Sequence, residues 1–170
     1  MRALVIYESM FGNTAEVARA IAGGLRETMP VDVREVADAP PDAVDRVDLI
    51  VAGGPTHAFS MSRPRTRAEA FAQGGMSGTV DVGLREWIRR VPSGHHAASF
   101  VTFDTKMARA RRWPGSAAKS AAKAGRRHGV PAAASPKSFY VVDTAGPLVD
   151  GEVDRATAWG RALGTIVQTP

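Results

Sequence analysis

The sequence contains no cysteine among its 170 residues. This absence excludes disulfides, thiolate zinc sites and cysteine-bound iron–sulfur clusters, so any redox chemistry has to come from a bound cofactor. No apolar run approaches the ~20 residues that cross a bilayer. The first residues do not predict a signal peptide either, because Arg2 leads into only five apolar residues before Glu8. We therefore expect a cytoplasmic protein that does not contact a membrane.

Acidic residues are absent from one long stretch of the chain. Between Asp104 and Asp143 there is no Asp or Glu, whereas nine residues are Lys or Arg. Since the formal charge of the whole chain is +5, removing these nine charges leaves −4 on the rest. The basic stretch has three interpretations, which we rank in this order: a solvated helix face, a surface that steers an acidic redox partner, and a nucleic-acid site.

The hydrophobic pattern alternates between short β-type runs and helical stripes. A balance of 44% hydrophobic and 23% charged residues predicts one globular domain over residues 1–170. Because strands alternate with helices along the chain, the pattern predicts an α/β fold with a parallel sheet covered by helices on both faces. The expected strands are 2–7, 31–36, 47–52, 99–103 and 138–142, and the expected helices are 14–28, 66–72, 84–90, 116–128 and 151–167.

The loop after the first strand has the features of a phosphate site. Residues 9–14 (Ser-Met-Phe-Gly-Asn-Thr) follow a buried strand and open an amphipathic helix. A phosphate here would meet free amides of the first helical turn and the positive end of the helix dipole. Ser9 and Thr14 add hydroxyls, and Gly12 allows close approach. In isolation these residues make only a turn with Asn13 as the helix cap, but ligands bind at the carboxyl edge of parallel sheets.

Residues 7–14 resemble the FMN phosphate loop of flavodoxins, in which a hydroxyl residue, two variable positions and Gly-Asn-Thr follow the first strand. The element order is also similar to that of short-chain flavodoxins, with an enlarged segment after the third strand. The resemblance implies a doubly wound five-stranded parallel sheet in the order 2-1-3-4-5, with FMN held by the loops after strands one, three and four. Carried over by position, the FMN-binding residues are Ser9, Met10, Phe11, Gly12, Asn13, Thr14, Pro55, Thr56, His57, Ala58, Phe59, Phe103, Asp104 and Thr105.

The sequence departs from the flavodoxin pattern in three respects. Phe11 stands where flavodoxins usually have a third hydroxyl. This feature and residues 53–56 (Gly-Gly-Pro-Thr) are more similar to NAD(P)H:quinone oxidoreductases of the tryptophan-repressor-binding-protein type. The second loop has no glycine between Pro55 and Met61, where many flavodoxins have one. The chain is also basic, whereas flavodoxins tend to be acidic.

Four residues near the expected site each have two interpretations. His57 and Phe59 lie where the resemblance places side chains against the flavin ring, or they pack on their own loop. Asp104 hydrogen-bonds the flavin edge or caps the turn that follows it. Trp113 stacks on a ring or pins its loop to the body of the protein.

These features lead to one main hypothesis and two alternatives. The main hypothesis is an FMN-binding electron-transfer protein that needs no catalytic acid or base of its own. The second is an FMN-dependent NAD(P)H or quinone reductase, in which residues 60–79 form the substrate-binding site over the flavin. The third is a flavin-free binding module on the same fold. The expected partner is a redox protein with an acidic face. No metal is expected, because His95 and His96 are adjacent and neighbours on an extended segment point to opposite sides.

Overall fold

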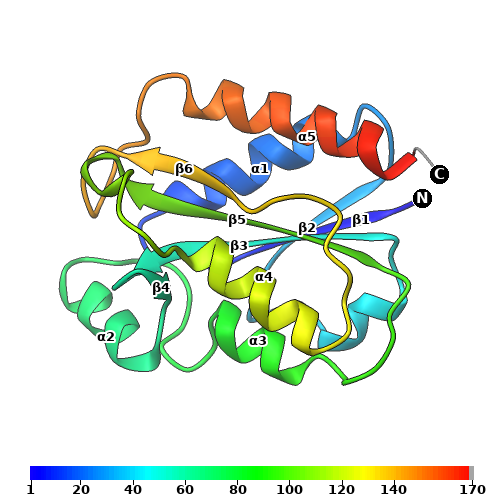
Figure 1. Cartoon of the computed structure of the whole chain (residues 1–170). Coiled ribbons are helices and arrows are strands. Elements are labelled where there is room, and N and C mark those ends of the chain that lie inside the picture. Colours follow the sequence, from blue (N-terminus) through cyan, green and yellow to red (C-terminus); the bar gives the residue numbers. More distant parts are fainter. Residues whose placement is uncertain (169–170) are drawn as a thin grey trace.

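Five parallel strands form the centre of the molecule. The computed structural model describes residues 1–168, and the strands of its main sheet pair in the order β2-β1-β3-β5-β6. Every pairing along this path is parallel. This confirms the predicted doubly wound order 2-1-3-4-5, since the fourth and fifth parallel strands carry the labels β5 and β6 (Figure 1). The bounds are β1 Ala3–Tyr7, β2 Val31–Glu35, β3 Leu49–His57, β5 Ser99–Met107 and β6 Lys137–Val141.

Helices cover both faces of the sheet, as the alternating pattern predicts. Helices α1 and α5 pack together on one face, and α3 and α4 lie on the other (Figure 1). A smaller helix, α2, lies beside the carboxyl ends of the strands, next to the short strand β4 (Figure 1). The bounds are α1 Asn13–Leu25, β4 Ser60–Met61, α2 Pro64–Ala72, α3 Leu84–Arg90, α4 Ala117–Arg127 and α5 Glu152–Gln168, with 3-10 turns at Pro41–Asp45 and Ala108–Ala110.

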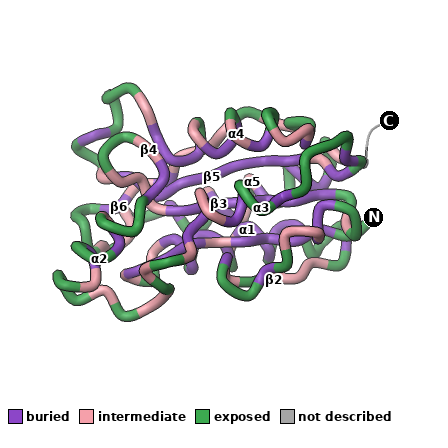
Figure 2. Tube along the Cα trace, turned by 90° about the horizontal axis from the view of Figure 1, so that it is seen from below, coloured by how far each residue is buried: buried purple, intermediate pink, exposed green. Residues whose placement is uncertain are grey.

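The sheet separates two hydrophobic cores. Val5 and Val51 point into the core beneath α1 and α5. Ile6 and Ile50, their neighbours along the strands, point into the opposite core around Trp87 of α3. Because the central strands are buried on both faces, they read as continuous apolar runs in the sequence. Figure 2 shows the same arrangement, with buried strands inside and exposed segments outside.

Two central strands extend further than predicted. Strand β3 continues to His57 rather than to residue 52, and β5 continues to Met107 rather than to residue 103. The parallel ladder between them continues to the pairs Gly54↔Asp104 and Pro55↔Thr105. Residues 55–57 and 104–105 therefore lie at strand ends and not in loops. The hydrophobic run marks only the buried part of each strand, whereas the ladder depends on the neighbouring strand.

Helices α1 and α5 approach each other through glycines, which gives a test of the packing. A Cβ atom at Gly24 would lie 2.1 Å from the carbonyl oxygen of Thr157. We expect Gly24→Ala to lower the unfolding free energy by about 1–3 kcal/mol, because the helices would have to move apart. The matched control is Gly23→Ala, where a Cβ meets nothing within 4 Å. There the gain in helix propensity should raise stability by up to about 1 kcal/mol. Denaturant unfolding measures both variants, and equal effects would contradict the packing.

Candidate functional site

A cavity of about 340 Å³ lies at the carboxyl ends of β1, β3 and β5. This volume falls within the range of small-molecule pockets, and carboxyl strand ends are where ligands bind in open α/β sheets. The loop after β1, the ends of β3 and β5, helix α2 and the segment after β6 all contribute to its wall. The lining residues are Ser9, Met10, Phe11, Asn13, Thr14, Pro55, Thr56, His57, Ala58, Thr66, Glu69, Ala70, Gln73, Thr105, Lys106, Met107, Val141 and Thr144.

The first turn of α1 has no side-chain cap. Gly12, and not Asn13 as predicted, is the N-cap residue, and it adopts a left-handed conformation with φ 88°. Asn13 instead donates its side-chain amide to the carbonyl oxygen of Ala145, 3.1 Å away. The amides of the first helical turn have no acceptor within the helix. They therefore remain available to an anion in the cavity, where the helix dipole also favours negative charge.

Three hydroxyl groups lie beside these amides. Ser9 Oγ accepts a hydrogen bond of 3.1 Å from the Gly12 amide, which closes the loop on itself. Thr14 and Thr105 share a hydrogen bond of 2.7 Å between their Oγ1 atoms, across the gap between α1 and β5. Ser9, Thr14 and Thr105 all line the cavity. This end of the cavity thus offers hydroxyl and amide donors without a cationic side chain from the loop.

A neighbouring segment holds the loop after β1 in place. The amide of Met76 donates to the carbonyl oxygen of Met10 over 2.9 Å. The hydroxyl of Ser77 donates to the carbonyl oxygen of Ser9 over 2.8 Å. Both bonds use main-chain acceptors of the loop, so its amides are not consumed by them. The enlarged segment between β3 and β5 is therefore part of the site's construction.

The turn between β3 and β4 is strained. Ala58 and Phe59 have φ values of 46° and 64°, as a two-residue hairpin of the I′ type requires. Such conformations cost non-glycine residues of the order of 1–3 kcal/mol and concentrate at functional sites. Phe59 contacts Trp113, with ring centroids 5.5 Å apart and planes inclined at 51°. Both residues are about half exposed, at 50% and 53%.

Ten of the fourteen residues expected to bind FMN line the cavity, and four do not. Gly12 forms the turn beneath it, and Phe59 points to Trp113. Phe103 is fully buried in the core, in contact with Phe139. Asp104 is also buried; its Oδ2 atom accepts from the Ala118 amide over 2.8 Å, in the first turn of α4 and not in the turn that directly follows β5.

Sequence reasoning missed the rest of the lining. Lys106 and Met107 lie in the unpredicted extension of β5, and Val141 and Thr144 lie at and after the end of β6. Helix α2 and its end contribute four lining residues, which were predicted only as part of the broad segment 60–79: Thr66, Glu69, Ala70 and Gln73. A signal existed for Lys106, because alternation along β5 places it on the same side as Asp104. No local pattern indicated Val141 or Thr144.

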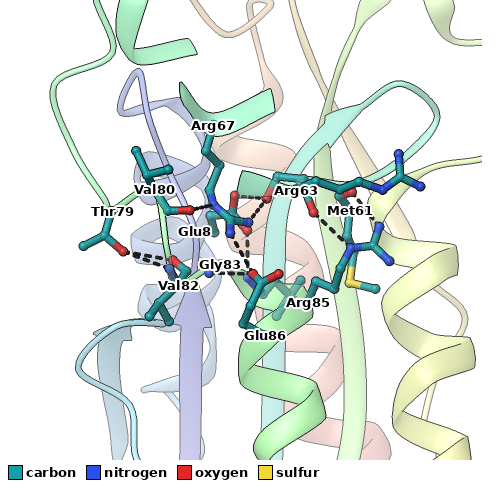
Figure 3. Close-up of polar contacts among 12 residues, drawn as sticks. Glu8, Met61, Arg63, Arg67, Thr79, Val80, Val82, Gly83, Arg85 and Glu86 are labelled. Carbon is teal, nitrogen blue, oxygen red and sulfur yellow. Dashed lines mark hydrogen bonds and ion pairs between the residues drawn. The ribbon is translucent and has the colours of Figure 1, made fainter. Parts of the chain in front are cut away.

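A buried polar cluster lies directly before the loop, at Glu8 (Figure 3). One oxygen of Glu8 accepts from the Ser62 hydroxyl, and the other accepts from the Leu84 amide over 2.7 Å. Arg67 of α2 is fully buried; it donates to Ser62 over 2.7 Å and forms an ion pair of 2.9 Å with Glu86 of α3. The cluster connects the end of β1 to both helices of the enlarged segment.

His57 is the titratable ring in the cavity wall. Burial lowers the pKa of His57 below its ordinary value, and the charge of Arg67 lowers it further, against a weaker opposing effect from Glu69. The imidazole is therefore neutral at neutral pH. Neither the cavity nor any other part of residues 1–168 contains three His, Asp or Glu side chains placed to hold a metal ion. No helix of the described chain is long and apolar enough to cross a membrane.

Comparison with known proteins gives the fold. No model of a known family matches the chain, and no curated protein matches its sequence. The structure is similar to a flavodoxin from the domain Archaea, with 20% identity, a TM-score of 0.66 and 99% of each chain covered. It is also similar to oxidised flavodoxin 2 from Bacillus cereus, with 14% identity, a TM-score of 0.71 and coverage of 97% of this chain and 99% of that one. A flavodiiron protein from Giardia intestinalis matches with 16% identity and a TM-score of 0.62, over 98% of this chain and 36% of that one. The fold is flavodoxin-like.

The cluster at Glu8 predicts a pH dependence of stability. Burial raises the pKa of Glu8, outweighing the hydrogen bonds from Ser62 and Leu84 and the charge of Arg67. The folded chain thus holds this proton more tightly than the unfolded chain, so stability falls as pH rises from 4.5, the ordinary pKa of a glutamate side chain, through the raised pKa of Glu8 in the folded chain. Glu8→Gln is neutral at every pH. We therefore expect the unfolding free energy of Glu8→Gln minus that of the unsubstituted protein to increase as pH rises through this window, because only the unsubstituted protein loses stability. Denaturant titrations at several pH values measure this difference. A difference that does not change with pH would contradict this.

Proposed function

We propose that the cavity binds FMN, with its phosphate on the first turn of α1, and that the protein transfers electrons. The observation that carries this proposal is the uncapped first turn of α1, which faces a cavity beside the hydroxyls of Ser9, Thr14 and Thr105. Neutral donors of this kind suit a monophosphate held by hydrogen bonds and the helix dipole. Each of the three hydroxyls comes from a different element or junction, yet all line one end of the cavity.

The remaining wall fits a flat, partly apolar ring system. Met10, Phe11 and Pro55 give apolar surface, and Thr56 and His57 give polar atoms. Beside them, Phe59 and Trp113 form the half-exposed aromatic pair described above. Such a mixture of apolar surface and a few polar groups is typical of cofactor sites. Aromatic surface around a flavin ring excludes water and thereby tunes its potential.

Bound FMN supplies one- and two-electron redox chemistry. The residues of this chain bind and orient it: the first turn of α1 holds the phosphate, and the ends of β3 and β5 hold the ring. The neutral His57 adds no charge to the wall. No side chain is required to act as a catalytic acid or base. On this proposal the protein is an electron carrier, and we place it in the cytoplasm.

Absorption spectroscopy tests FMN binding. We expect the purified protein to carry flavin bands or to acquire them on titration with FMN. Ser9→Ala and Thr14→Val each remove a hydroxyl from the phosphate end. Hydrogen bonds to charged groups contribute about 1.5–3 kcal/mol, so each variant should weaken FMN binding by roughly 10- to 150-fold.

Two controls make the test specific to the phosphate. Riboflavin lacks the phosphate, so its affinity should be nearly the same for the unsubstituted protein and both variants. Ser93→Ala changes an exposed serine on the connection between α3 and β5 and should leave FMN binding unchanged. If FMN does not bind at concentrations far above micromolar, the electron-transfer proposal is wrong. The chain would then be a flavin-free binding module on this fold.

One observation supports an FMN-dependent NAD(P)H or quinone reductase as the second candidate. Helix α2 and its end contribute Thr66, Glu69, Ala70 and Gln73 to the cavity wall. The enlarged segment thus adds a side to the cavity beyond the three strand ends, which provides room for a substrate beside the flavin. Steady-state oxidation of NADPH or NADH with a quinone distinguishes this enzyme from a carrier.

We further propose that the carrier's partner is a redox protein with an acidic face, and that it docks on α3 and α4. These helices contact each other, and their outer faces carry exposed cations that form no ion pair or hydrogen bond within residues 1–168. We call this surface the basic face; it consists of Arg89, Arg90, Lys119, Lys123, Arg126 and Arg127. It begins next to the cavity, because the Ala117 amide at the start of α4 donates to Thr56 over 2.9 Å. Charge complementarity of this kind speeds association.

Reaction with small oxidants tests the basic face. In the FMN-loaded, reduced protein we expect oxidation by anionic ferricyanide to slow with rising salt, because screening weakens the attraction. The double variant Lys123→Glu/Arg127→Glu should react several-fold more slowly at low salt and equally fast at high salt. A neutral quinone should show neither effect. If duplex DNA binds the unsubstituted protein at physiological salt and not the double variant, the basic face serves nucleic acid and the acidic-partner proposal fails.

A further inference from the structure

Lys106 is a buried cation in the cavity wall. It is only 6% exposed and lines the cavity at the end of β5. Its ammonium group donates to the carbonyl oxygens of Trp113 and Gly115, over 2.8 and 3.2 Å. An ammonium group has three donors and one full charge. The two carbonyl groups satisfy two donors, but they do not neutralise the charge.

The alternation of β5 places Lys106 on the opposite side of the strand from the phosphate end. Thr105 points toward α1, where it meets Thr14. Asp104 points toward α4, where it meets the Ala118 amide, and Lys106 follows on that same side. The charge of Lys106 is therefore separate from the hydroxyls that bind the phosphate in the proposed function. Lys106 still contributes to the cavity wall, while its ammonium group lies beside the carbonyl oxygens of Trp113 and Gly115.

No carboxylate in residues 1–168 forms an ion pair with Lys106. The acidic residue nearest in sequence, Asp104, is directed to the start of α4 and to Thr56, which donates to it over 3.1 Å. Glu69, the carboxylate of the cavity wall, pairs with Arg65 over 3.1 Å. Burying a cation without a counter-charge is costly, so such a group points to a negative charge on the ligand.

We propose that Lys106 is a specificity-determining residue that makes the cavity bind reduced FMN in preference to oxidised FMN. This inference rests on the proposed FMN binding. The oxidised ring is neutral. Uptake of two electrons and one proton, from a donor protein or from dithionite in the test, leaves one negative charge on the ring. The attraction between that charge and a buried ammonium group acts only on the reduced state, so it raises the reduction potential of the bound flavin.

Three variants separate the charge of Lys106 from its hydrogen bonds. Lys106→Gln keeps two N–H donors for the carbonyl groups and removes the charge. Lys106→Met removes both, and Lys106→Arg keeps both. The matched control is Lys137→Met, which removes a partly exposed lysine at the start of β6, outside both the cavity wall and the basic face.

The measurements are the dissociation constant of oxidised FMN and the midpoint potential of the bound flavin in a dithionite titration against a reference dye. We expect Lys106→Gln and Lys106→Met to lower the preference for reduced FMN by about tenfold, which is about 30 mV in the two-electron midpoint potential. Lys106→Arg should keep most of the preference, and Lys137→Met should keep all of it. Either uncharged variant suffices if the other does not fold.

The outcomes distinguish this inference from the proposed function. If the unsubstituted protein does not bind FMN, the proposed function fails and the inference fails with it. If FMN binds but the uncharged variants keep the original midpoint potential, the inference alone is overturned. If they weaken both redox states equally and lower the unfolding free energy, Lys106 only fastens the loop that contains Trp113, and the inference is again overturned.

Discussion

The packing of the Phe103 ring over Gly53, between the paired strands β3 and β5, is the constraint on which the geometry of the cavity depends. The ring of Phe103 occupies the space above Gly53, where a Cβ atom would lie only 2.2 Å from the ring. The two residues pair in the parallel ladder, and Phe103 packs in turn on Phe139, with ring centroids 6.4 Å apart. A larger residue at position 53 would displace the ring of Phe103 from this position. The register fixed here decides which residues of β5 reach the cavity.

In this register, two successive residues of β5 contribute different groups to the cavity wall, a neutral hydroxyl and a positive charge. Thr105 faces α1 and shares a hydrogen bond with Thr14, which adds a neutral hydroxyl to the anion-binding end. Lys106 faces the loop before α4 and adds a buried positive charge. Because successive side chains of a strand point to opposite faces of the sheet, these two groups are separated although they are adjacent in the sequence. One strand end can therefore bind a phosphate by neutral donors and also place a cation elsewhere in the site.

The enlarged segment between β3 and β5 stabilises the site from outside the sheet. Arg67 and Glu86 form an ion pair beside Glu8, so one guanidinium lies among two carboxyl groups (Figure 3). A proton on Glu8 makes this cluster neutral, which agrees with the raised pKa of that residue. Gly83 leaves room for this cluster, because a Cβ there would lie 2.3 Å from Nη1 of Arg67 and 2.6 Å from Oε2 of Glu8 and would displace them. Buried polar clusters of this kind restrict the conformations of the segments that they join.

The strand order came from the resemblance to flavodoxins. Local patterns alone were sufficient to predict the α/β fold class, the bounds of α3 and the position of the loop after β1. These features follow from hydrophobic period, turn residues and short-range motifs, which neighbouring residues determine. The FMN-binding roles of the fourteen predicted residues stay predictions.

Only the tertiary structure decided the ends of β3 and β5, the cap of α1 and the cavity wall beyond the first loop. Strand ends depend on a pairing partner about fifty residues away, as in Pro55↔Thr105. Asn13 does not cap its own helix because its side chain bonds Ala145, 132 positions along the chain. Lys106 enters the cavity because β5 remains paired up to Met107. The sequence by itself determined which elements form, and packing between distant elements determined which side chains meet, because no local pattern encodes a contact across the sheet.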